Sequence, residues 1–228
     1  MVGTECVVCK FKAGCFTVLS EQQLREVSES KIRIHFKKGE TIRKQGSYSK
    51  GVLYLSNGFA KVYKEIADSN VNSIVTLYKP GKMIGLSGLF TGRTAPYTVV
   101  AMTDCTVCCI EFEAFKRMMK ENVEFTMDII RSLNEQHRLL FDFQISNNHK
   151  QLHGRLAEAI LYLREHVFQS DHFEVPLSRK ELGEYTNMST MSVVRIFKSF
   201  KEDGILDEDD GRIKILDIEK LAKIRAKG

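Results

Sequence analysis

Three cysteines lie close together near the start of this 228-residue chain. Cys6, Cys9 and Cys15 have the spacing C-x2-C-x5-C, and Gly14 permits a tight bend before the third thiol. A C-x2-C pair can turn both sulfur atoms onto one soft metal centre. Because three thiolates are one short of a closed site, a fourth ligand has to come from elsewhere in the chain.

The remaining cysteines are Cys105, Cys108 and Cys109. If one of them completes the set, the metal ties an N-terminal segment, residues 1–19, to the body of the protein. The spacing alone favours zinc and an iron–sulfur cluster about equally. On a strand, Cys105 and Cys109 would lie on the face opposite Cys108. We expect these two to be buried neutral thiols, with a role as substitute ligand or resolving thiol as the alternative.

The composition is that of a soluble globular protein, with 43% hydrophobic and 28% charged residues. No apolar run approaches the roughly 18 residues of a membrane span, and no signal peptide is visible. We therefore expect a cytoplasmic protein with no membrane partner. In a reducing cytoplasm, clustered thiols favour metal binding or redox sensing over disulfides. The net charge of +5 does not by itself indicate nucleic acid.

The first half of the chain, residues 20–120, has the pattern of a small β-domain. Ser20 begins a capping box, which predicts a helix to about Ser28. Alternating Ile32, Ile34 and Phe36 then predict a half-buried strand, and Asn57-Gly58 predicts a hairpin between its flanking strands. Further short strands, with a polar turn at Asp68–Asn70 between two of them, predict an antiparallel barrel or sandwich up to about residue 112.

Residues 121–148 contain neither Gly nor Pro and predict a long helix, about 40 Å at ~1.5 Å per residue. Its apolar seam has the 3-4-3 spacing of a coiled coil, which favours a homodimer over a helix that only covers the barrel. We expect His137 in this seam to be a packed polar residue rather than a haem ligand. The predicted dimer interface consists of Ile130, Leu133, His137 and Leu140. A hinge is predicted at 147–149.

Residues 149–228 predict a second, mostly helical domain. After an amphipathic helix and a short strand over 173–177, Ser178 caps a helix to Tyr185, and a second helix runs from Ser189 or Thr190 to about Lys201. A hairpin then pairs Ile205-Leu206 with 213–215 across Asp210-Gly211. A helix, a tight turn, a helix and a two-stranded wing form a winged helix-turn-helix. The chain as a whole is predicted to be α+β.

Local charge, rather than domain charge, indicates DNA binding. From residue 151 onward there are 13 Lys and Arg against 14 Asp and Glu, whereas Ser178–Lys201 holds five basic and two acidic residues. Hydroxyls and backbone N–H groups at the start of the second helix suit phosphates, and Arg195 can pair with guanine. The alternative is a helix pair that only packs against the rest of the domain. Such a pair does not need a hydroxyl-rich helix start followed by Arg and then Lys on one face. The predicted DNA-binding residues are Ser178, Arg179, Ser189, Thr190, Met191, Ser192, Val194, Arg195 and Lys198.

Several motifs together resemble one family. Gly39–Ile42, Leu53–Gly58 and Pro80–Gly85 resemble successive strands of the cyclic-nucleotide-type β-roll, while Ser178–Gly183 and Ser189–Phe200 resemble the DNA reader of the same proteins. On nearly its whole length the chain therefore resembles the Crp/Fnr family of transcription regulators. It most resembles the iron–sulfur Fnr branch, because the Cys6–Cys15 run is followed by Leu19-Ser20-Glu21 and because Val107–Glu113 matches the stretch around that branch's internal ligand.

The resemblance implies a β-roll sensor, a long dimerisation helix and a winged helix-turn-helix. It also implies that Cys6, Cys9, Cys15 and Cys108 hold a [4Fe–4S] cluster that senses oxygen or nitric oxide. The implied partners are double-stranded DNA, a second copy of the chain and RNA polymerase. The alternatives are a regulator of this fold with haem or no cofactor, and one with a structural zinc. In the cluster hypothesis, loss of the cluster alters a dimer that holds two readers one DNA turn (~34 Å) apart.

Two departures from the family matter. Cyclic AMP-binding members have Glu and Arg-Ser where this chain has Leu86 and Ala95-Pro96, so we do not expect cAMP as a ligand. Fnr-type readers carry Glu-x-x-Ser-Arg, whereas this chain reads Met191-Ser192-Val193-Val194-Arg195. Met191 cannot accept a hydrogen bond from cytosine N4, and contacts of Met191 or Val194 with thymine methyl groups are the alternative.

The sequence does not indicate an enzyme. It contains no paired carboxylates, no nucleophile–base set and no Walker loop. Residues 81–92 are rich in glycine but lack the Lys-Ser/Thr ending of a phosphate-binding loop, so we expect them to form turns of the β-roll.

Overall fold

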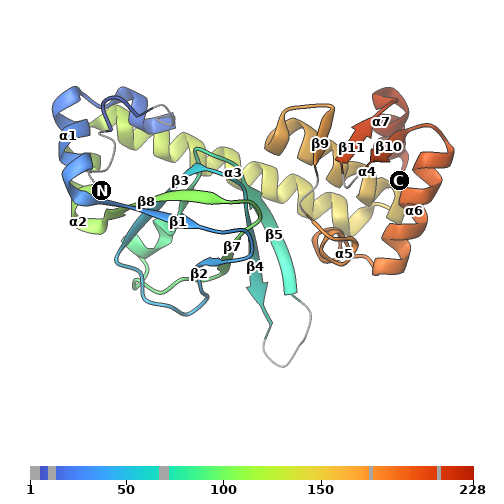
Figure 1. Cartoon of the computed structure of the whole chain (residues 1–228), viewed down its shortest axis with the longest axis horizontal. Coiled ribbons are helices and arrows are strands. Elements are labelled where there is room, and N and C mark those ends of the chain that lie inside the picture. The colour runs from blue at the N-terminus through green and yellow to red at the C-terminus, as the bar shows by residue number, and fades with distance from the viewer. Residues whose placement is uncertain (1–5, 10–13, 67–71, 175–176, 210–211) are drawn as a thin grey trace. The chain divides into compact units, whose positions relative to one another are not determined.

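The computed structural model describes residues 6–9, 14–66, 72–174, 177–209 and 212–228 (Figure 1). The predicted turns at 68–70 and 210–211 lie outside these ranges. The described residues divide into two compact units. The first comprises those up to Glu65 and Leu77–His137, and the second comprises those of 66–76 and Arg138–Gly228. The predicted domain boundaries at residues 20, 121 and 149 stay predictions.

The N-terminal part of the first unit contains the short 3-10 helix η1 (Gly14–Val18) and helix α1 (Glu21–Ser30). The predicted capping box is confirmed, because the Gln23 N–H donates to Ser20 Oγ at 3.2 Å and the Ser20 N–H donates to Gln23 Oε1 at 3.1 Å. Two backbone donors that the helix leaves unpaired are thereby satisfied. Helix α1 ends at Ser30 rather than at Ser28.

Two four-stranded antiparallel sheets form the β-roll, which confirms the predicted architecture. One has the order β1-β8-β3-β6 and the other β2-β7-β4-β5. Their bounds are β1 Lys31–Phe36, β2 Thr41–Arg43, β3 Gly51–Asn57, β4 Ala60–Glu65, β5 Asn72–Tyr78, β6 Met83–Ile84, β7 Thr98–Ala101 and β8 Cys105–Glu111. The short 3-10 helix η2 (Leu86–Leu89) follows β6 and forms one of the predicted turns of the roll.

The predicted hairpin at Asn57-Gly58 is wrong. Strands β3 and β4 belong to different sheets, and the turn carries the chain from one to the other. Gly58 has φ +87°, as a turn glycine should, but a Cβ there would lie 2.5 Å from the Asp104 carbonyl oxygen. The glycine is thus required by the close approach of the segment before β8, which pairs with β3.

The predicted burial of strand β1 is also wrong. Ile32 and Ile34 are exposed, whereas Arg33 between them is half-buried. Strand β1 lies at the edge of its sheet, so its apolar side chains have neighbours on one adjacent strand only. Alternation predicted the strand correctly, but it could not show that the strand is an edge.

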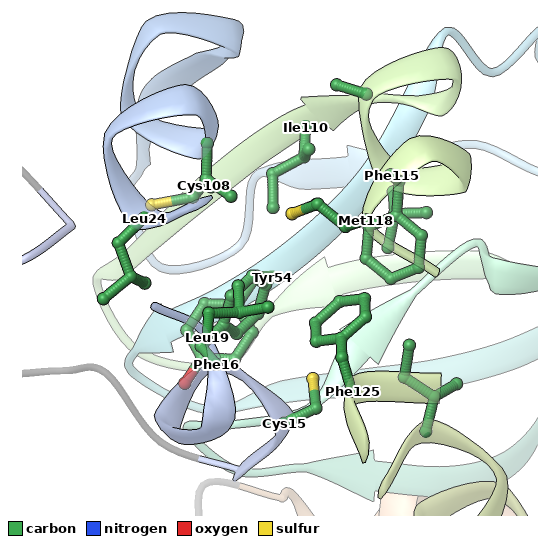
Figure 2. Packing of buried hydrophobic residues seen from close by; sticks show 14 of the residues in the cluster. Cys15, Phe16, Leu19, Leu24, Tyr54, Cys108, Ile110, Phe115, Met118 and Phe125 are labelled. Atoms are coloured by element: carbon green, nitrogen blue, oxygen red, sulfur yellow. The ribbon is translucent and has the colours of Figure 1, made fainter. Parts of the chain in front are cut away.

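Strand β8 contributes to two apolar clusters, one on each face. Cys108 and Ile110 pack with Phe16, Phe115 and Phe125 in the first cluster (Figure 2). Cys105 and Val107 belong to the second cluster, and Cys109 packs against it. The prediction that Cys105 and Cys109 lie opposite Cys108 is confirmed. Burial raises the pKa of both thiols, as expected for neutral buried cysteines.

The predicted long helix is present and is preceded by a shorter helix, with one residue between the two. Helix α2 (Phe112–Glu121) ends just before Asn122, and helix α3 (Val123–His149) follows over 27 residues. The Phe125 N–H donates to Asn122 Oδ1 at 2.9 Å, so Asn122 caps α3 without any Gly or Pro. The predicted hinge at 147–149 is wrong, because α3 continues through these residues.

The second unit contains the predicted winged helix-turn-helix. Helix α4 (Leu152–Tyr162) continues into a π-helical turn, η3 (Leu163–Phe168). Helices α5 (Arg179–Thr186) and α6 (Thr190–Glu202) follow, and β9 (His172–Glu174), β10 (Leu206–Asp209) and β11 (Arg212–Ile215) form a three-stranded sheet in the order β10-β11-β9. Helix α7 (Ile218–Lys227) was not predicted, although a capping residue, Asp217, followed by apolar Ile218 and Leu221 is a pattern that indicates a helix.

The turn between α5 and α6 depends on two residues. Asn187 has φ +54°, and the Met188 N–H donates to the Gly183 carbonyl at 2.8 Å. A Cβ on Gly183 would lie 2.6 Å from the Met188 carbonyl oxygen, so a larger residue would push the two helices apart. This close approach explains the glycine in the predicted motif. In the described part of the chain, no helix is both long and apolar enough to cross a membrane.

The junction at Asn122 gives a stability prediction. Besides capping α3, Asn122 Nδ2 donates to the Val18 carbonyl at 3.3 Å and to Gln23 Oε1 at 3.0 Å. We expect Asn122→Ala to lower the free energy of unfolding of the first unit by about 1–2 kcal/mol, the usual cost of a lost cap. Chemical denaturation measures this. Ser132→Ala, at an exposed position of the same helix, is the control and should change stability by less than about 0.5 kcal/mol. Equal effects of both changes would contradict the capping role.

Candidate functional site

Three of the four predicted cluster ligands line one pocket in the first unit. Cys6, Cys9 and Cys108 line a small pocket of about 30 Å³ that is partly open to solvent. Its other walls come from η1, α1, β3 and β8 and from Lys31, and they comprise Phe16, Leu24, Val27, Lys31, Tyr54, Ser56 and Ile110. The pocket is therefore mostly apolar, with sulfur as its main ligating atom. All six cysteines of the chain are free thiols.

Helix α1 and the residue after it position Cys6. The Cys6 N–H donates to Ser28 Oγ at 2.6 Å, and that hydroxyl in turn donates to the Leu24 carbonyl at 3.0 Å. The Cys9 N–H donates to the Cys6 carbonyl at 3.3 Å, which holds the two thiols on one turn. Lys31 Nζ donates to the Cys6 sulfur at 2.8 Å. Sequence reasoning missed Lys31, which looked like one of several exposed charges on an alternating strand.

Cys15 does not line this pocket. It is 7% exposed, and it faces a separate cavity bordered by Gly81, Asp128 and Ile129. Figure 2 shows the Cys15 sulfur turned toward Phe125 and the Cys108 sulfur turned toward Leu24. Burial, with a further contribution from Asp128, raises the pKa of the Cys15 thiol to about 12. As placed, Cys15 is a neutral thiol in an apolar cluster.

The residues thus fit a thiolate-ligated metal group in part. Three thiols share one pocket with the donor chemistry that zinc or an iron–sulfur cluster requires. The fourth predicted ligand, Cys15, would have to leave the cluster and lose its proton. Within the described ranges, no three His, Cys, Asp or Glu side chains are arranged to hold a metal ion.

Arg43 lies by Ala95 and Pro96, where the sequence departs from the pattern of cAMP-binding family members. Arg43 borders a small concavity together with Ser49, Gly85 and Ala95. Its guanidinium donates to Ser49 Oγ and, at 3.3 Å, to the Gly51 carbonyl, and burial lowers its pKa. The absence of cAMP as a ligand stays a prediction.

Helix α3 carries an exposed apolar stripe. Its large apolar members recur at intervals of three or four residues, and Asn134 and His137 occupy the two positions in the middle. Ile130 belongs to the stripe, as predicted, whereas Leu133 packs against the first cluster and Leu140 is half-buried. The exposed large apolar residues of α3 are Val123, Met127, Ile130, Phe141 and Ile145. Such spacing is that of a coiled-coil seam.

Helix α6 has two contrasting faces. Val193, Ile196, Phe197 and Phe200 are buried. Most of the predicted DNA-binding residues of this helix lie on the exposed side, namely Thr190, Met191, Val194, Arg195 and Lys198. Ser189 caps the helix, because the Ser192 N–H donates to Ser189 Oγ at 3.1 Å and the two hydroxyls bond to each other at 2.9 Å. Those two hydroxyls therefore already have partners.

Two predicted DNA contacts on α5 are engaged within the protein. Ser178 Oγ accepts from the Glu181 N–H at 3.2 Å as the cap of α5. The Arg179 guanidinium lies 3.7 Å above the Phe197 ring and forms an ion pair with Glu208. Arg179 thus ties α5 and α6 to the wing, a role for which the sequence gives no separate signal.

Comparisons with known proteins agree with this architecture. The cyclic nucleotide-binding domain family matches residues 33–122, and the Crp-like helix-turn-helix domain family matches residues 154–224. The transcriptional activator protein FnrA of Stutzerimonas stutzeri is 26% identical over 79% of this chain and 75% of its own length. The nitrogen fixation regulation protein FixK of Bradyrhizobium diazoefficiens is 24% identical over 98% of this chain and 95% of its own length.

Among solved structures, FixK2 from Bradyrhizobium japonicum has a TM-score of 0.77 at 18% identity, covering 87% of this chain and 98% of its own. Likeness at this identity shows the fold. The two family matches cover the β-roll and the helix-turn-helix of this chain. The chain belongs to the Crp/Fnr family of transcription regulators, and its similarity to FnrA and FixK supports the Fnr-like branch of that family.

Proposed function

We propose that the chain is a homodimeric, DNA-binding transcription regulator that senses oxygen or nitric oxide through a [4Fe–4S] cluster. The proposed ligands are Cys6, Cys9, Cys15 and Cys108. The observation that carries the proposal is the shared pocket of Cys6, Cys9 and Cys108, which brings thiols from distant parts of the sequence together. A bound cluster would supply an oxygen-labile link between the N-terminal segment and strand β8.

The chain's own residues prepare this pocket. Ser28 holds the backbone of Cys6, and Lys31 donates a hydrogen bond to its sulfur. Hydrogen bonds to cluster sulfurs are among the means by which proteins tune reduction potentials. The apolar walls, including Phe16 and Leu24, would lower the dielectric constant around a bound group.

A second candidate is a regulator of the same fold with a structural zinc in this pocket. The position of Cys15 favours it, because the three thiols that share the pocket do not include the fourth cluster ligand. Zinc bound by these three thiolates would have its fourth tetrahedral position open to another ligand, such as water. Metal analysis distinguishes the two candidates.

The cluster proposal predicts the metal content of three proteins purified without oxygen. We expect the parent to contain about four iron and four sulfide ions per chain, to be coloured, and to lose both iron and sulfide in air together with tight DNA binding. Cys108→Ala should lose most of the iron. Cys105→Ala is the matched control on the opposite face of β8 and should retain it.

Colourless, zinc-containing parent protein whose DNA affinity is unchanged in air would contradict the cluster and support the zinc candidate. Iron content in Cys108→Ala equal to that of the parent would contradict the assigned ligand.

The placement of Cys15 predicts unequal alkylation in the metal-free protein. Because Cys15 is buried with a pKa of about 12, only a small fraction of this thiol is ionised near pH 8. The thiolate is the form that reacts. We expect iodoacetamide to modify Cys15 at least about tenfold more slowly than Cys9. Mass spectrometry of timed digests measures the rates. In denaturant the rates should become similar, and similar rates in native protein would contradict the placement.

The exposed stripe of α3 predicts where the dimer forms. A charge at Ile130 would have to be buried in the seam, which is costly without a partner. We expect Ile130→Glu to raise the dimer dissociation constant by about tenfold or more, as measured by sedimentation. Ser132→Glu introduces the same charge two residues away on another face of the helix and should leave the dimer intact. A dimer unaffected by Ile130→Glu would show that the stripe has another use.

A further inference from the structure

Two apolar side chains are exposed on the recognition helix α6. Met191 is 78% exposed and Val194 is 45% exposed, and they are the large apolar side chains that α6 exposes. The apolar residues that support the fold, Val193, Ile196 and Phe197, are buried on the other side of the helix. Single exposed apolar residues are common on proteins and need no explanation by themselves. Here the pair shares its face with charged residues.

That face combines apolar contact with positive charge. At about 100° per residue, positions 191, 194, 195 and 198 fall within an arc of roughly 100°. Arg195 is exposed and has no hydrogen-bond or ion-pair partner among the residues that the structure describes. Lys198 is exposed and lies 3.7 Å from Glu202, an ion pair that is weak at a surface. The face therefore suits an anionic partner that also presents apolar groups.

We propose that Met191 and Val194 contact thymine C5-methyl groups in the major groove, beside a guanine bound by Arg195. The proposal rests on the proposed function as a DNA-binding regulator. Thymine is the base that presents a methyl group in the major groove, and apolar side chains read it by contact. Recognition helices place their N-terminal residues against base edges, and Met191 is the second residue of α6. Arg195 follows one turn later on the same face.

A protein partner is the other explanation for an exposed apolar pair. The residues around the pair argue against it. Thr190, with the first backbone N–H groups of α6, borders it on one side, and Arg195 and Lys198 border it on the other. Phosphates on both sides of a groove match this arrangement. The half-site should thus contain at least one thymine next to the guanine.

The test begins with the full chain, prepared with and without iron, and a library of randomised DNA duplexes. Selected half-sites should contain the thymine–guanine step. Each selected thymine is then replaced by uracil, which removes only the methyl group. We expect the parent to lose about fourfold in affinity at a contacted thymine, the equivalent of about 0.8 kcal/mol for one methyl group. Met191→Ala or Val194→Ala should bind the thymine and uracil duplexes equally.

Lys198→Ala is the matched control on the same face. It should weaken binding to all duplexes by a similar factor and leave the thymine-to-uracil ratio unchanged, because a phosphate contact carries no sequence information. Met191→Leu, which keeps an apolar side chain, should restore the response to the methyl group.

Each other result overturns part of the argument. Specific binding in which no uracil substitution affects the parent, or in which both alanine variants keep the full response, would overturn methyl recognition and leave the regulator intact. Failure to enrich any sequence in either preparation would overturn the proposed DNA-binding function and, with it, this inference.

Discussion

The alternation of side chains along strand β8 is the constraint on which the first unit depends. Because successive side chains point to opposite faces, Cys108 lies in one apolar cluster while Cys105 and Cys109 lie on the side of the other. A shift of one residue would remove Cys108 from the thiol pocket and turn two other thiols toward it. The pairing of β8 with both β1 and β3 fixes this register. The position of one thiol is thus set by two ladders of backbone hydrogen bonds.

The cluster that contains Cys108 also connects the N-terminal segment to the long helix. Phe16 from η1 contacts Tyr54 of β3 with ring centroids 4.9 Å apart and Phe125 of α3 at 5.7 Å, both edge-to-face. Asn122 adds hydrogen bonds from the start of α3 to the segment around Val18. Interiors of this density transmit a displacement rather than absorb it. In the proposed sensor, a displacement of the cysteine-bearing segment would therefore first move the beginning of α3.

Local patterns predicted the elements well and their partners less well. The capping box at Ser20, the helix cap at Ser178, the helix-turn-helix and the opposite faces of Cys105 and Cys108 follow from short-range rules. Asn57-Gly58 failed because a positive φ specifies a turn but not which strands pair across it. The spacing of the cysteines indicated that Cys15 is a metal ligand, but spacing alone contains no information on whether the thiol is buried in an apolar cluster instead. The engagement of Arg179 with Phe197 and Glu208 depends on contacts distant in sequence, which no local pattern contains.

Cys15 brings two physical demands into competition. In the apolar cluster its thiol is neutral and buried beside Phe16, and burying so small a side chain is worth about 1 kcal/mol, because each buried methylene contributes about 0.8 kcal/mol. As a ligand it would have to be ionised and exposed to a metal. Thiolate ligation of structural metals is worth about 10–16 kcal/mol in small domains, whereas switching a protein almost completely needs about 5.5 kcal/mol. The free energy of metal ligation can therefore exceed the cost of moving Cys15 out of the apolar cluster. Without the metal, burial in that cluster would be the more stable position of Cys15. Two alternative positions of one segment, each stabilised by a different force, are what a switch at this end of the chain requires.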